Sequence, residues 1–188
     1  ITDQKIKNIS GLPVDARIAY ATFSPDETKL AFTNTTDSGV ELWVIDFQKL
    51  SAHKVTDPVL NANAGHPYSW FPDSKSLLVR IIPENRAELM TEKETLPQGP
   101  IISNSDGQIS QNRTYQDLLK NDRDETNFEL LITSELYKID LSGKKELWKT
   151  AGMHISESFS PDGDYLLLKT LTHPFSYVVP YNSFPNAT

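Results

Sequence analysis

The chain has 188 residues, which corresponds to one or at most two ordinary domains. Its 18 Lys and Arg against 25 Asp and Glu give a formal net charge of −7, which excludes the basic surface needed to bind nucleic acid phosphates. The absence of cysteine excludes disulfides, thiolate catalysis and cysteine-ligated metal centres. No apolar run approaches the ~20 residues required to cross a bilayer, so we expect no membrane span.

A ten-residue pattern occurs three times along the chain, and each copy reads as a strand end, a Pro-Asp turn and an apolar strand. The copies are 23–32, 70–79 and 159–168. Proline presets φ at position i+1 of a type I turn, and the following aspartate accepts hydrogen bonds from nearby backbone N–H groups. The pattern therefore predicts three similar β-hairpins, with Asp26, Asp73 and Asp162 as turn-capping residues rather than calcium ligands.

The spacing of these turns indicates a repeat of supersecondary units. Asp26 and Asp73 are 47 residues apart, and each unit contains a Glu-Leu-aromatic-x-Ile-Asp segment that ends at Asp46 or Asp140. The second unit contains 47 additional residues, without which it is 42 residues long. Four-stranded propeller blades repeat every ~40–45 residues, so the spacing predicts a β-propeller.

Each complete unit is expected to hold four strands. In the first unit they lie near 18–23, 29–34, 41–46 and 53–56, and in the second near 68–71, 77–82, 135–140 and 146–149. The third unit has strands near 155–159, 165–170 and 176–181, and 5–9 is expected to close a preceding blade. We predict an all-β fold: an incomplete β-propeller of about two whole four-stranded blades plus partial blades. Residues 1–188 are assigned to one domain, with blades at about 16–57, 66–150 and 153–188.

The second blade carries a short, partly helical insertion at about 83–134, between its second and third strands. Segment 114–120 predicts one short helix, and 124–131 predicts a second, in which Phe128 and Leu131 share a face. Because the strands of a blade alternate in direction, we expect the insertion on the face that also carries His66 and His154, opposite the Pro-Asp turns.

Four segments around the insertion resemble a known family. They are Pro-Tyr-Ser-Trp-Phe-Pro-Asp-Ser at 67–74, Leu-Pro-Gln-Gly-Pro at 96–100, Arg-Thr-Tyr-Gln-Asp-Leu-Leu-Lys-Asn at 113–121 and Pro-Phe-Ser-Tyr-Val-Val-Pro-Tyr at 174–181. They look like the propeller region of the glutamyl endopeptidase type of the prolyl oligopeptidase family. The resemblance implies a serine peptidase whose propeller covers and gates a carboxy-terminal α/β-hydrolase domain that bears Ser, Asp and His and acts on peptides.

That catalytic domain is absent from this chain. A nucleophile elbow requires Gly-x-Ser-x-Gly, and no two of the eight glycines lie four residues apart. We therefore expect no catalytic residue, no cofactor and no activity in the chain alone. The Pro-Asp repeat is also similar to TolB, so the alternative is a non-enzymatic propeller that binds proteins in the cell envelope. A propeller glycosidase is a third option, although the repeat pattern singles out no pair of catalytic carboxylates.

Arginines of the insertion are the candidate substrate contacts. A peptidase that cuts after Glu requires a cation near the substrate carboxylate, and a guanidinium pairs with a carboxylate through two hydrogen bonds. Arg113 and Arg123 lie in the insertion, with Arg80 and Arg86 nearby. The alternative for each is a structural ion pair.

Other candidates have simpler structural explanations. His66 and His154 could share a rim, but ordinary loop histidines are the simpler interpretation, and we predict no metal site. Trp43 and Tyr137 occupy matching blade positions and could stack on sugars, although an inter-blade core is the simpler interpretation.

An incomplete ring leaves strand edges open, and such edges pair with other copies, so we predict self-association of the fragment. The family resemblance allows a periplasmic or cell-envelope location in a bacterium and a plastid in a plant, and the location is left open between them.

Overall fold

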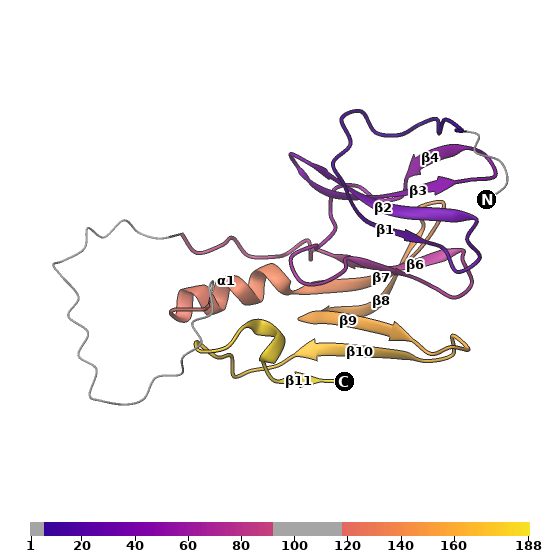
Figure 1. Ribbon diagram of the computed structural model, residues 1–188. Helices are drawn as coiled ribbons and strands as arrows, with labels where there is room; N and C mark the ends of the chain where they lie inside the picture. Colours follow the sequence, from indigo (N-terminus) through magenta and orange to yellow (C-terminus); the bar gives the residue numbers. More distant parts are fainter. Residues whose placement is uncertain (1–5, 92–117) are drawn as a thin grey trace, which may run out of the picture.

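The computed structural model describes residues 6–91 and 118–188, which form three antiparallel sheets and one α-helix (Figure 1). The first sheet contains β1 (Ile18–Phe23), β2 (Lys29–Thr36), β3 (Gly39–Asp46) and β4 (Ser51–Lys54). The second contains β5 (Tyr68–Trp70), β6 (Ser76–Ile81), β7 (Ser134–Asp140) and β8 (Lys145–Gly152), and the third contains β9 (His154–Phe159), β10 (Leu166–Leu171) and β11 (Asn186–Ala187). Helix α1 (Asp122–Ile132) lies between β6 and β7, and a 3-10 turn, η1 (Tyr181–Ser183), precedes β11.

The first two sheets have the same topology. In each, four strands pair with their neighbours in chain order, β1-β2-β3-β4 and β5-β6-β7-β8, and every pair is antiparallel. The third sheet repeats the first three positions as β9-β10-β11. Figure 1 shows the sheets following one another from the amino to the carboxyl end. Repeated four-stranded meanders packed side by side are blades, so the predicted incomplete β-propeller is confirmed.

The three Pro-Asp turns join the first two strands of each sheet, and their aspartates cap them. Asp26 accepts a hydrogen bond from the Thr28 backbone N–H (3.0 Å) and another from the Ser24 hydroxyl (2.6 Å). These bonds, the Ser24 bond foremost, lower the pKa of Asp26 to about 2. Asp73 accepts from the Lys75 N–H (2.8 Å) in the same way. The predicted turn-capping role is therefore confirmed.

The residue after each of these aspartates adopts a left-handed backbone. Glu27 has φ +59°, Ser74 has φ +56° and Gly163 has φ +80°. Only glycine adopts this region without a steric cost, so two of the three turns hold a strained residue.

The first two sheets pack through an apolar core. It contains Leu42, Val44, Leu77 and Val79, all fully buried, from the facing surfaces of β2–β3 and β5–β7. Tyr68 crosses this core, and its hydroxyl lies within hydrogen-bond distance of the Tyr20 carbonyl of β1 and the Ala31 carbonyl of β2, which share its single O–H donor. Strand β6 is buried along its whole length because it is covered on both faces.

The second and third sheets meet through a buried ion pair. The Arg80 guanidinium donates to a Glu157 carboxylate oxygen, and both side chains are 3 % exposed. Glu157 also accepts from the Ser69 hydroxyl (2.7 Å), and Arg80 donates to the Ala64 carbonyl. The rings of Phe71 and Phe159 also pack against each other, with centroids 4.8 Å apart.

Two predicted strands are wrong. Segment 176–181 contains no strand, and β11 at Asn186–Ala187 pairs with β10 in its place. Pro180, which has no backbone N–H to donate, and η1 interrupt the extended chain there. The described part of 5–9 is not a strand either. Ser10 instead forms a single parallel bridge to Ser51 at the outer edge of β4.

Candidate functional site

Helix α1 lies in the insertion, and it agrees with the predicted helix at 124–131. Asn121 caps it, because its side chain accepts a hydrogen bond from the Asp124 N–H (2.9 Å). Acidic residues fill the first turn, where the helix dipole favours negative charge. Of the other predicted helix, 114–117 lies outside the described residues and 118–120 is not helical.

The carboxyl end of α1 is fixed to the connection between the first and second sheets. The buried Asn61 side chain donates to the carbonyl oxygens of Leu131 and Thr133, both at 2.9 Å. Carbonyls at a helix end have no partner within the helix, so Asn61 satisfies groups that are otherwise costly to bury. Ile132 joins an apolar cluster with Ala64, Met153, Leu171 and Phe184. Helix α1 therefore packs against the 60–66 connection and against Met153, the residue before His154, which agrees with the predicted face.

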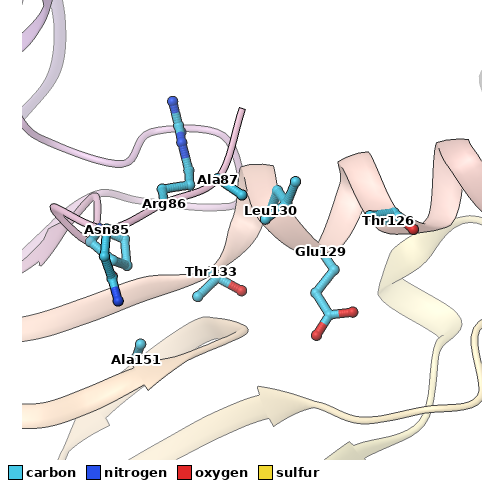
Figure 2. Close-up of a pocket in the computed structure, with 9 residues that line it drawn as sticks. Asn85, Arg86, Ala87, Thr126, Glu129, Leu130, Thr133 and Ala151 are labelled. Carbon is cyan, nitrogen blue, oxygen red and sulfur yellow. The ribbon is translucent and has the colours of Figure 1, made fainter. Parts of the chain in front are cut away.

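A groove of about 360 Å³ lies between α1 and the chain that follows β6, and we call it the α1 groove (Figure 2). Its lining comprises Pro83, Asn85, Arg86, Ala87, Thr126, Glu129, Leu130, Thr133 and Ala151. Figure 2 shows the Asn85 side chain pointing toward Ala151 of β8. The Arg86 side chain points in the opposite direction, away from Ala151. The groove is at the small end of the range for small-molecule sites.

One side chain of α1 holds the far wall of this groove in place. Asn127 accepts from the Met90 N–H (2.8 Å) and donates to the Met90 carbonyl (2.9 Å), so its amide pairs with Met90 as a neighbouring strand would. The groove thus has two walls that are linked directly to each other. Nothing in the spacing of the sequence marks Asn61 or Asn127 for these roles, since each bond depends on a long-range approach.

The candidate arginines occupy different environments. Arg113 lies outside the described residues. Arg123 is on α1, its side chain 30 % exposed, 3.5 Å from the Asp124 carboxylate. Arg86 lines the α1 groove. Arg80 is buried in the ion pair with Glu157, so for this residue the structural alternative is correct.

The two histidines considered together each have separate partners. His66 Nδ1 lies 2.7 Å from the Tyr68 carbonyl. His154 is 3 % exposed and contacts Thr150 and Thr170, and burial lowers its pKa. Within residues 6–91 and 118–188, no group of three or more metal-binding side chains is found.

Trp43 and Tyr137 occupy matching strand positions on successive blades, but only Tyr137 packs between two described sheets. Tyr137 packs against the core between the first two sheets, which confirms its inter-blade role. Trp43 packs on the other face of the first sheet, over Phe32. The Trp43 indole N–H donates to Glu41 (2.8 Å), as the Tyr137 hydroxyl does to Glu135 (3.0 Å).

These sheets, their repeated turns and their order in the chain define a segment of a β-propeller. Along 95 % of its length, the chain is 32 % identical to a probable chloroplastic glutamyl endopeptidase of Oryza sativa subsp. japonica and 34 % identical to one of Arabidopsis thaliana. The chain spans about a fifth of these relatives, 20 % and 19 % of their lengths. The predicted resemblance to the glutamyl endopeptidase type is thereby confirmed. No family model matches the chain.

Solved structures with similar folds are more distant. An acylaminoacyl peptidase of Pyrococcus horikoshii is 16 % identical, with a TM-score of 0.46 over 86 % of this chain and 22 % of its own. The β-propeller domain of the Trilobed protease from Pyrococcus furiosus is 19 % identical, with a TM-score of 0.33 over 87 % of this chain and 51 % of its own. In the described part of the chain, no helix is long and apolar enough to traverse a membrane.

Proposed function

We propose that this chain is the propeller portion of a serine peptidase, in which it covers and gates an α/β-hydrolase domain that lies outside these 188 residues. The observation that carries the proposal is the 32–34 % identity to two glutamyl endopeptidases, which extends over 95 % of the chain. In this proposal, residues 1–188 belong to one propeller domain, with blades at about 16–57, 66–150 and 153–188. The partners are the hydrolase domain and the peptide substrate.

A propeller suits this role for a physical reason. The blades are rigid sheets, so a propeller that covers an active site keeps bulky folded proteins away from it. The loops at the ends of the blades vary in length and sequence, and they are the parts that can contact a substrate. The long insertion that contains α1 is such a loop. Within it, helix α1 is held by Asn61 and by the apolar cluster around Ile132, so α1 presents a defined surface.

The substrate contacts of this proposal are Arg113 and Arg123. Arg123 is partly exposed on α1, but it lies beside Asp124 and among acidic neighbours. A guanidinium so placed can still pair with a substrate carboxylate if it exchanges partners. Replacement of either arginine by Ala in the full-length enzyme is expected to lower kcat/KM for Glu substrates more than for Gln substrates. An unchanged ratio of the two values removes that residue from the site.

The proposal is tested by activity of the full-length protein that contains this chain. We expect it to cleave fluorogenic peptides after Glu, and we expect a serine-directed inhibitor to block cleavage. This chain alone is expected to be inactive under the same conditions, because it contains no Gly-x-Ser-x-Gly. An inactive full-length protein that instead retains protein partners in a pull-down favours the TolB-like binding platform.

We further propose that the chain by itself self-associates through its open edges. Strand β10 pairs with β11 only at Thr170 and Leu171, so most of that edge of the third sheet has no partner strand in the described chain. Sedimentation velocity is expected to show a species larger than 21.2 kDa that grows with concentration. A single monomeric species at all concentrations contradicts this.

A further inference from the structure

One wall of the α1 groove carries an arginine that has no carboxylate partner in the described chain. The backbone N–H of Arg86 donates to the Pro83 carbonyl (3.0 Å), whereas its side chain forms no hydrogen bond or ion pair within residues 6–91 and 118–188. In a chain with a net charge of −7, an unpaired guanidinium at a groove favours an anionic ligand from outside. The other described arginines each contact a carboxylate: Arg17 contacts Asp37, Arg80 contacts Glu157 and Arg123 contacts Asp124.

The opposite wall carries a carboxylate. Glu129 lines the groove from α1, and Figure 2 shows Arg86 and Glu129 on opposite sides of Leu130. Glu129 Oε2 lies 3.2 Å from His173 Nε2, while Oε1 accepts no hydrogen bond from the described part of the chain. The Glu129 side chain is 46 % exposed, so its second oxygen can accept from a ligand. The groove therefore offers a cation on one side and an anion on the other.

The lining between these charges combines apolar surface with hydrogen-bonding groups. Leu130, Ala87 and Ala151 supply carbon atoms that can pack against an apolar side chain. The side chains of Asn85 and Thr133 form no hydrogen bond to other described residues, so an amide and a hydroxyl are available to a ligand. Peptide groups, which contain both a donor and an acceptor, match such side chains.

The two walls of the groove are already joined in this structure. Asn127 of α1 both accepts from and donates to the backbone of Met90, at 2.8 and 2.9 Å. Asn61 and Asn63 donate to the Leu131 carbonyl at the end of α1, both at 2.9 Å. A ligand therefore does not have to order the walls on binding, which lowers the entropic cost of association.

We propose that the α1 groove binds short free peptides, with the terminal carboxylate at Arg86, the terminal ammonium at Glu129 and an apolar side chain between them. A free peptide carries these three kinds of group in this order, whereas an internal segment of a longer chain lacks both charged ends. The groove volume of about 360 Å³ suits a small ligand rather than a folded partner. Short peptides are the products of peptide hydrolysis, so a role as a product site rests on the proposed peptidase function, but the binding itself does not.

Isothermal titration calorimetry of the full-length protein tests the site, with the tripeptide Ala-Leu-Ala as the probe. The protein is first treated with a serine-directed inhibitor, so that the proposed peptidase active site is blocked. We expect saturable binding at peptide concentrations up to about 10 mM. Amidation of the carboxyl terminus and acetylation of the amino terminus are each expected to weaken binding about tenfold, as the loss of one charge-assisted hydrogen bond does. Capped peptides that bind as tightly as the free peptide overturn the proposal.

Two variants locate the charged ends of the peptide. Arg86→Gln is expected to weaken binding of Ala-Leu-Ala about tenfold and to leave binding of the amidated peptide unchanged, because that peptide has no terminal carboxylate. Glu129→Gln is expected to have the same effect on the free peptide and none on the acetylated one. Arg17→Gln is the matched control, since it removes an arginine that pairs with Asp37 in the first blade, and it is expected to bind like the unmodified protein. Unchanged binding in both groove variants shows that the peptide binds elsewhere and overturns the proposal.

A further variant and the inhibitor separate this site from the proposed peptidase. Ala151→Phe places a large ring in the groove, and it is expected to abolish peptide binding without changing the reaction with the inhibitor. A protein that binds the peptide but does not react with the inhibitor contradicts the proposed peptidase and supports the groove site. A protein that reacts with the inhibitor but binds no peptide at about 10 mM overturns the groove site alone.

Discussion

The two interfaces between neighbouring sheets are built from different chemistry. Between the first and second sheets, side chains such as Leu42 and Leu77 bury apolar area, and one tyrosine hydroxyl satisfies backbone oxygens. Between the second and third sheets, the Arg80–Glu157 ion pair is 3 % exposed on both sides. The same blade topology is therefore compatible with an interface of apolar side chains and with an interface that contains a buried ion pair. Apolar packing depends on shape and volume, whereas a buried ion pair depends on keeping both partners.

The two interfaces also differ in the titratable groups that they bury. Burial raises the pKa of Tyr68 in the first interface to about 12, and burial lowers the pKa of His154 in the second. We therefore expect the first interface to weaken in alkali and the second in acid.

The largest effect is expected from removing one member of the ion pair. Arg80→Ala leaves the Glu157 carboxylate buried without a counter-charge, so we expect a loss of about 3–5 kcal/mol in the free energy of unfolding. The double variant Arg80→Met/Glu157→Leu removes both charges and is expected to recover most of that loss. Urea titration of the full-length protein measures both. A double variant as unstable as the single one shows that the interface needs the ion pair itself.

The next largest effect is expected at Tyr68. Tyr68→Phe removes the donor to the Ala31 carbonyl (2.8 Å) and the acceptor for the Thr22 hydroxyl (3.1 Å), so a loss of about 1–3 kcal/mol is expected.

Ionisation of Tyr68 is expected to lower the stability of the fold at alkaline pH. The folded state holds the phenol proton more tightly than the unfolded state, so stability falls as pH rises from about 10 toward about 12. Tyr68→Phe is expected to lack this part of the alkaline decline. An identical decline in both proteins contradicts the assignment.

A smaller effect is expected from His154 in acid. Its folded-state pKa lies below the ordinary value of 6.5, so the contribution is fully present above that pH and is lost as the pH falls through the folded-state value. Exchange of β9 and β10 amides is expected to accelerate on acidification in the unmodified protein and much less in His154→Gln. The core strands β2 and β3 of the first sheet serve as the internal control, and equal acceleration there means that acid acts on the whole fold.

The smallest effects are expected at the strained turns. Glu27→Gly relieves a left-handed backbone, and the Glu27 side chain forms no hydrogen bond to the described residues that would be lost, so a gain of about 0.5–1 kcal/mol is expected. Ser74→Gly relieves the same strain, but it removes the hydroxyl that accepts from the Asp26 N–H (3.0 Å), so little or no gain is expected. Thermal unfolding of the two variants makes the comparison, and equal gains show that the bond to Asp26 contributes nothing.

Local sequence patterns predict some features of the candidate site and not others. The helix at 124–131 could be predicted because its periodicity is a property of its own residues, and Asn121 caps it from the adjacent position. The contact between His173 and Glu129 could not be predicted, since these residues are 44 positions apart and meet only when the segment after β10 folds onto α1. The role of Arg80 was open for the same reason, because its partner Glu157 is 77 residues away.

By itself the sequence determined the blades: the three Pro-Asp turns, the apolar strands that follow them and a repeat that is near-constant once the insertion is set aside are local or periodic, and hairpin pairing converts them directly into sheets. Only the tertiary structure decided which strand completes the third sheet, which charges are buried and which side chains anchor α1. These outcomes depend on contacts between residues far apart in the chain, where the desolvation of a charge or a helix end is offset only by a partner that the fold brings to it.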